Sequence, residues 1–268
     1  TMISFLLETP FMPLLLLLCS LKVPNDARMA RRDKEEEEAS VAYKVEMTIR
    51  EYQREHFGLK PDDHEGLRDV LGVDFRGVGA PYTGPRLHQD IPERGVRADD
   101  WGIHRRWVEH ESGGYWDYCD FPLRDADEET VANWPMPSPD QHDYRGIRDA
   151  CRHHERYAVH IGGPGLGCII NTAGFFRGME QVFVDLALDE PAGLLLIDRI
   201  LDIQFEVARR TLEAAAGGFD FMWMGEDLGS QHSPLISLGL FRRYIAPRHQ
   251  RFFDLAKAYK LPVMMHTC

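Results

Sequence analysis

The sequence predicts an α/β fold with parallel strands, and its second half carries the observations that predict it. Three short β-prone runs lie at 157–161, 219–225 and 261–265, and the last two are largely apolar on both faces, as in strands covered by helices. Amphipathic helical patterns separate the runs. Because strands joined through helices pair in parallel by right-handed crossovers, we expect one parallel sheet.

The first half of the globular region is less regular. Short helices are predicted at 48–57 and at 66–71, the second ending at Gly72, and the Gly- and Pro-rich stretch 73–100 predicts loops. Residues 101–118 alternate partly between apolar and polar, which indicates a β-hairpin with its turn at Gly113 and Gly114.

The run GGPGLG, residues 162–167, follows the first of the three strands. It does not match the GxGxxG dinucleotide fingerprint in register, and Pro164 interrupts it. We therefore expect a strand-to-helix loop whose backbone lies close to a pocket.

One helical region is predicted before each of the two later strands, 219–225 and 261–265. Asp189 is the expected N-cap of the first, with Pro191 in its first turn, and Gly217 is its expected stop. Its apolar stripe recurs at spacings of three and four, at Leu194, Ile197, Leu201, Phe205, Ala208 and Leu212. Ser237 is expected to cap the second helix, and Pro247 to end or kink it before a further piece runs to Tyr259.

Composition excludes several classes of partner. The 268 residues include 31 Lys and Arg against 43 Asp and Glu, a formal net charge of −12. Nucleic acids and anionic membrane surfaces want clustered basic residues, so neither is expected as the main partner, and a small-molecule substrate is. The five cysteines have no spacing typical of a disulfide framework, which indicates a reducing compartment, the cytoplasm.

The leading 46 residues differ from the rest. Residues 2–21 are apolar, but Glu8, Pro10 and Pro13 interrupt them, so a membrane span is not predicted. The run lacks the basic start of a signal peptide. A charged stretch, RRDKEEEE at 31–38, follows. We expect 1–46 to be an extension that is disordered or not native, and 47–268 to be the folded domain.

Adjacent carboxylates, Glu226 and Asp227, directly follow the 219–225 strand. In parallel α/β barrels, functional groups gather at the carboxyl ends of strands and in the loops after them. Glu226 and Asp227 are therefore candidate catalytic residues. Acid/base chemistry, metal ligation and hydrogen-bond anchoring all remain open for such a pair.

A second candidate site follows the last strand, at His266 and Cys268. Alternate residues of a strand point to the same side, with about 6.5–7 Å between their Cα atoms. An imidazole nitrogen and a thiolate at this spacing can reach one tetrahedral Zn²⁺. A catalytic zinc needs a third ligand, for which Glu226 or a cysteine beyond residue 268 are the candidates.

These motifs together resemble a known family. The run GFDFMWMGEDLGSQHSPLISLGLFRRYIAPRHQRFFDLAKAYKLPVMMHTC, residues 218–268, is similar to the uroporphyrinogen decarboxylase (URO-D) superfamily. The similarity lies in an acidic pair after a strand, a GSQ segment, a PLIS helix start, LFRRYIAPRH and a strand ending in HTC. Weaker similarity extends through RGMEQVFVDLALDEP, residues 177–191, and covers about 47–268 in all.

The resemblance implies a TIM (β/α)8 barrel and either of two chemistries. Uroporphyrinogen decarboxylase, a lyase of porphyrin biosynthesis, removes carboxylates from a porphyrinogen without a cofactor, using arginines and an aspartate. The methylcobalamin-dependent methyltransferases bind zinc through His-x-Cys and a later Cys, and activate a thiol. His266 and Cys268 match that pair, whereas the RQAGRY arginine motif of the decarboxylase is absent.

The resemblance therefore implies zinc-thiolate methyl transfer, with His266 and Cys268 as ligands and methylcobalamin, on a corrinoid protein or free, as co-substrate. Gln231 and Arg242 lie within the matching run and are candidate substrate-binding residues. Porphyrinogen decarboxylation is the alternative. A third hypothesis is a non-catalytic fragment, because the strands found are too few for a barrel of eight and its C-terminal part is expected to be missing.

Overall fold

The fold is described from a computed structural model, which places residues 56–60, 63–110 and 113–267. The expected extension 1–46, most of the predicted helix 48–57, and Cys268 lie outside the described residues. The described chain divides into two compact units, one with residues before 75 together with 107–117, the other with 75–106 and 118–267.

The first unit contains α5, His64–Val70, the helix predicted at 66–71. It begins earlier than predicted because Asp63 caps it, its carboxylate accepting the Gly66 backbone N–H at 2.8 Å. Gly72 follows the helix with a φ of +65°, a left-handed conformation that suits glycine.

The expected hairpin is present as β3, His104–His110, and β4, Gly113–Tyr118, and β2, Val96–Ala98, adds a third strand on the far side of β3. The predicted turn position is wrong, because Gly113 and Gly114 are the first residues of β4. The indole of Trp107 lies over Gly114, where a Cβ would be 2.6 Å from the ring. Gly114 therefore makes room for a cross-strand aromatic ring.

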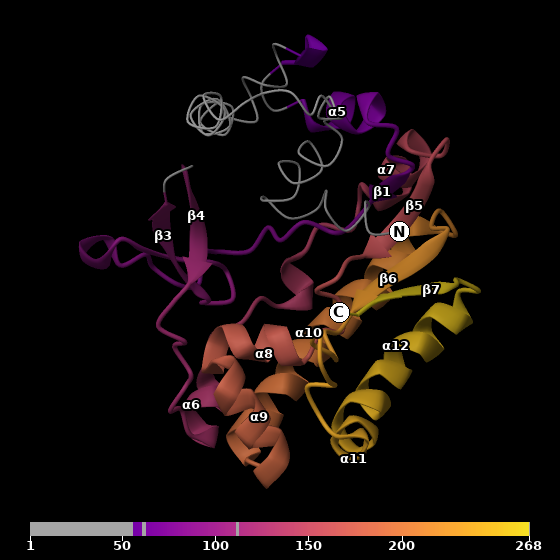
Figure 1. Ribbon diagram of the computed structural model, residues 1–268. Helices are drawn as coiled ribbons and strands as arrows, with labels where there is room; N and C mark the ends of the chain where they lie inside the picture. Colours follow the sequence, from indigo (N-terminus) through magenta and orange to yellow (C-terminus); the bar gives the residue numbers. More distant parts are fainter. Residues whose placement is uncertain (1–55, 61–62, 111–112, 268) are drawn as a thin grey trace, which may run out of the picture. The chain divides into compact units, whose positions relative to one another are not determined.

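A four-stranded parallel sheet forms the centre of the second unit (Figure 1). Its strands are β1, Phe75–Gly77, β5, Ala158–Gly162, β6, Phe221–Gly225, and β7, Val263–His266. They pair in chain order, with Gly77 beside His160, Gly162 beside Trp223, and Gly225 beside His266. The parallel α/β prediction is confirmed, and all four carboxyl ends lie at one edge.

Helices fill the connections between these strands. Between β1 and β5 lie the short helices η1 (Pro92–Arg94), α6 (Glu128–Asn133), η2 (Pro139–Gln141) and α7 (Ile147–His153). Three helices, α8 (Ile170–Arg177), α9 (Met179–Leu188) and α10 (Pro191–Ala215), connect β5 to β6, and α11 (Leu238–Leu240), η3 (Phe241–Ile245) and α12 (Ala246–Ala258) connect β6 to β7. No helix among the described residues is long and apolar enough to cross a membrane.

One predicted helix boundary needs correction, and another is confirmed. Asp189 does not cap α10; its φ of +59° places it at the left-handed end of α9, and Glu190 is the N-cap residue of α10. The change of helix predicted at Pro247 is confirmed, because the π-helical turn η3 ends at Ile245 and α12 begins at Ala246 with Pro247 in its first turn. Ser237 caps α11 as predicted, accepting the Leu240 N–H at 3.2 Å.

The main core lies between the sheet and helices α8, α10 and α12. Met222 and Met224 of β6 and Val159 and Ile161 of β5 are almost wholly buried there. Residues of the predicted α10 stripe, including Ile197, Leu201 and Leu212, pack against them. Burial of this apolar surface holds the helices against the sheet and sets the position of the carboxyl edge.

Candidate functional site

The predicted acidic pair and the predicted metal ligand meet at the carboxyl edge of the sheet. Glu226 and Asp227 directly follow β6, and His266 is the last residue of β7. The ladder continues one step beyond β6, since the Glu226 N–H donates to the His266 carbonyl at 3.0 Å. This bond brings Asp227 and His266 together.

Glu226 is turned into the protein rather than toward solvent, with 1% of its surface exposed. Its carboxylate accepts the backbone N–H groups of Ile169 at 2.7 Å and Ile170 at 3.0 Å, at the start of α8. The Cys168 thiol donates to it from 3.7 Å. Of the roles left open for Glu226, this geometry favours the hydrogen-bond anchor, because the carboxylate satisfies N–H groups that the first turn of a helix leaves without partners.

His249 completes the surroundings of Glu226. It lies on α12, is 3% exposed, and places Nε2 3.5 Å from the carboxylate. The same nitrogen lies 3.0 Å from the Gly167 carbonyl, and because a carbonyl only accepts, Nε2 carries the proton. Glu226 and His249 together fix the loop between β5 and α8.

Asp227 has a different environment, half-buried and within reach of solvent. One carboxylate oxygen accepts the side-chain amide of Asn171, from α8, at 2.6 Å. The other lies 3.4 Å from Nε2 of His266. An amide on one side and an imidazole on the other hold this carboxylate at the edge, so Asp227 and His266 form the polar pair of the site.

The remaining predicted ligand cannot be placed, because Cys268 lies outside the described residues. Its neighbour Thr267 is within them, and its hydroxyl oxygen accepts the Leu228 N–H at 3.4 Å. Over the part of the chain that the structure describes, no three or more His, Cys, Asp or Glu residues are grouped to hold a metal ion. A metal at His266 therefore needs a ligand such as Cys268.

The two candidate substrate-binding residues, Gln231 and Arg242, are both exposed, one in the loop after β6 and the other in η3. The structure does not gather the nearby arginines into one site. Arg243 forms a salt bridge with Asp189 at 2.8 Å, and Arg248 forms a bidentate salt bridge with Asp198 at 2.7 and 3.0 Å.

Cys168 is one of the groups around the Glu226 carboxylate, although its sequence context indicates only an ordinary thiol. Burial, together with the nearby Glu226 carboxylate, raises its pKa to about 12. A thiol in this state is a poor nucleophile at neutral pH. Cys168 is therefore a structural group.

Sequence reasoning missed Asn171 and His249. Both come from helices whose distance from the strand ends depends on packing, and a lone Asn or His on a helix carries no spacing signal. For Asn171, its position shortly after the GGPGLG loop was the one available indication, since residues that follow a barrel strand often face the site.

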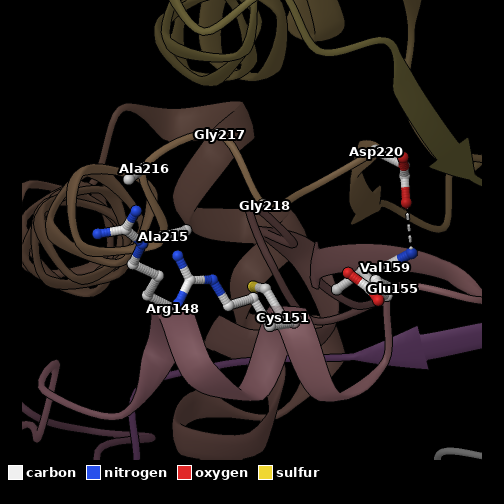
Figure 2. Close-up of a pocket in the computed structure, with 10 residues that line it drawn as sticks. Arg148, Cys151, Glu155, Val159, Ala215, Ala216, Gly217, Gly218 and Asp220 are labelled. Carbon is white, nitrogen blue, oxygen red and sulfur yellow. Dashed lines mark hydrogen bonds between the residues drawn. The ribbon is translucent and has the colours of Figure 1, made fainter.

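Two of the cavities among the described residues flank the sheet. One, of about 280 Å³, opens at the amino-terminal edge between α7 and the end of α10, and Figure 2 shows Arg148, Cys151 and Asp220 around it. The Asp220 carboxylate there accepts the Val159 N–H at 2.8 Å, an internal bond of the fold. The other, of about 360 Å³, lies at the carboxyl edge, next to the GGPGLG loop.

Comparison of the sequence with protein-family models and with curated proteins finds no match.

Proposed function

We propose that this chain is a URO-D-type (β/α)8-barrel enzyme that transfers a methyl group to a thiol with the help of zinc. The order of the parallel strands supports the barrel, because each new strand is added beside the previous one, as in a TIM barrel. The polar groups after β6 and β7 lie at the carboxyl edge, where such barrels place their chemistry.

The observation that carries the proposal is the contact between Asp227 and His266. A carboxylate 3.4 Å from Nε2 favours the tautomer with its proton on that nitrogen and its lone pair on Nδ1. Histidine ligands of metals commonly donate their second ring N–H to a carboxylate in this way. Asn171 holds the other oxygen of Asp227, which keeps the carboxylate aimed at the imidazole.

The donor atoms available here suit zinc. His266 supplies an imidazole nitrogen and Cys268 a thiolate, and Asp227 orients the imidazole. A further cysteine is the proposed third ligand, because the Glu226 carboxylate already accepts the N–H groups of Ile169 and Ile170. Zinc bound there would act as a Lewis acid that favours the thiolate form of a substrate thiol at neutral pH. In this proposal His266 and Cys268 bind the metal and Asp227 orients the imidazole. Glu226 and His249 keep the loop between β5 and α8 rigid.

The proposed substrates are a small thiol as methyl acceptor and methylcobalamin as donor, the donor either free or carried by a corrinoid protein. We place the reaction in the cytoplasm, because the described cysteines, Cys119, Cys151 and Cys168, are all free thiols. Porphyrinogen decarboxylation has less support, since a substrate with many carboxylates needs convergent arginines and Arg243 and Arg248 are paired with aspartates.

An assay of methyl transfer tests this function. The purified chain with added zinc is incubated with methylcobalamin and a thiol acceptor such as 2-mercaptoethanol, and the thioether product is measured by mass spectrometry. We expect product from the native chain and loss of at least tenfold in His266→Ala and in Cys268→Ser. Formation of coproporphyrinogen from uroporphyrinogen, with no thioether, would instead establish the decarboxylase alternative.

A further inference from the structure

The cavity at the carboxyl edge is a different site from the polar pair, Asp227 and His266, beside β7. It lies between the first half of the sheet and α10, next to the ends of β1 and β5. Its volume, about 360 Å³, falls in the range of small-molecule sites. In parallel α/β folds, ligands bind at the carboxyl ends of the strands, and this cavity has that position.

The walls of this cavity are mostly apolar. Ile161, Leu166 and Val207 contribute aliphatic surface, and the described lining contains no Lys, Arg, Asp or Glu. Gly163 and Gly165 line it with bare backbone, which allows a flat molecule to approach closely. These walls suit an uncharged, planar ligand.

One lining side chain offers a defined hydrogen-bond acceptor. Nδ1 of His142 lies 3.1 Å from the Ser138 carbonyl, so it donates there, and Nε2 of the neutral ring is an acceptor. Burial lowers the pKa of His142, which keeps the ring neutral at pH 7. Tyr82 and Tyr144 pack around the imidazole, with ring centroids 5.4 and 6.3 Å away, and hold its orientation.

Two further polar side chains of the lining, Gln204 and Thr211, make internal hydrogen bonds. The Gln204 amide accepts the Gly167 N–H at 2.9 Å and donates to the Gly165 carbonyl at 3.2 Å. The Thr211 hydroxyl donates to the Val207 carbonyl at 2.7 Å. One side of the cavity is therefore formed by a braced loop, and Nε2 of His142 is the nitrogen acceptor that the lining side chains offer.

We propose that this cavity binds a neutral, planar aromatic molecule that carries one N–H or O–H donor, which His142 accepts while the ring lies on the glycine wall. Trp101, also in the lining, adds an aromatic surface for the ligand. This site is separate from the proposed zinc site, and its existence does not depend on methyl transfer.

The test uses indole as the probe and 1-methylindole, which lacks the N–H, as its matched partner. Binding of each to the purified full-length chain is measured by saturation-transfer NMR and titration calorimetry. We expect indole to bind roughly fivefold more tightly than 1-methylindole, the effect of one hydrogen bond. In His142→Phe, which keeps a planar ring but lacks the acceptor, the two probes should bind equally.

A second variant fills the space. A Cβ added at Gly165 would have no other atom within 4 Å, so the Gly165→Leu side chain can occupy the rim of the cavity without a clash at its Cβ. Binding of both probes should then be lost. Gly146→Leu, equally open but outside the cavity, is the control and should bind like the native chain. Circular dichroism checks that each variant folds. Absence of indole binding to the folded native chain, equal binding of the two probes to it, or unchanged binding in Gly165→Leu would overturn the proposal.

Discussion

At the scale of single residues, Glu226 and Asp227 are neighbours in the chain with opposite surroundings. Glu226 is enclosed and anchors the start of α8, whereas Asp227 faces His266 at the edge. We predict that Glu226→Ala lowers the free energy of unfolding by about 2–4 kcal/mol, because two buried N–H groups lose their acceptor. Urea unfolding followed by circular dichroism measures this loss.

Glu180→Gln, at an exposed position in α9, is the control and should change the stability by no more than about 0.5 kcal/mol. If Glu226→Ala were as stable as the control variant, the anchoring role would be wrong, and a catalytic role for Glu226 would regain support.

Cys168 gives a second prediction at the residue scale. Its pKa of about 12, against 9.0 for the ordinary thiol, should leave Cys168 unmodified by iodoacetamide at pH 8 in the folded chain and modified after unfolding. As the pH rises, the Cys168 thiol loses its proton at a lower pH in the unfolded chain than in the folded chain. The contribution of Cys168 to the free energy of unfolding should therefore fall between about pH 9 and pH 12. Mass spectrometry of the tryptic peptides checks the labelling, and rapid modification in the native chain would contradict it.

At the scale of elements, α8 and α9 are joined by a buried ion pair. Arg177 binds Asp185 through Nε at 2.6 Å and Nη2 at 3.1 Å, and it also donates to the Leu123 carbonyl at 2.8 Å. Both side chains are at most 5% exposed. Removal of one partner leaves a buried charge without compensation, so Arg177→Met should cost about 3–5 kcal/mol of stability.

The matched control is Arg251→Met, which breaks a solvent-exposed pair with Asp202. Exposed pairs contribute about 0–1 kcal/mol, so this variant should stay close to the native chain. Equal midpoints of urea unfolding for the two variants would show that the Arg177–Asp185 pair does not hold α8 to α9.

Most elements of the second half were predictable because local signals agree with the tertiary fold. Strands β5, β6 and β7 are short β-prone runs, and the long α10 has an apolar stripe at helical spacing. The errors arise where tertiary packing, rather than the local sequence, determines where a strand or helix begins and ends. Gly114 lies in a strand because Trp107 covers it, and Asp189 closes α9 rather than opening α10. The partners of Glu226 were not predictable, because no local pattern relates it to the N–H groups of Ile169 and Ile170.

At the scale of the whole molecule, we propose that the carboxyl edge of the parallel sheet binds zinc through His266 and Cys268, with Asp227 as the orienting group. The sequence resemblance and the contact between Asp227 and His266 at this edge both support it. It concerns binding, and so it can be tested without knowledge of the substrate.

The most direct measurement is the zinc content of the purified full-length chain by inductively coupled plasma mass spectrometry, after zinc supplementation and dialysis. We predict about one zinc per chain, lost in His266→Ala and kept in His232→Ala, which changes an exposed histidine of the neighbouring loop. Asp227→Asn should weaken zinc affinity by roughly 10–100-fold, as for other orienting partners of metal ligands. A folded native chain without zinc, or a His266→Ala variant that retains it, would contradict the account.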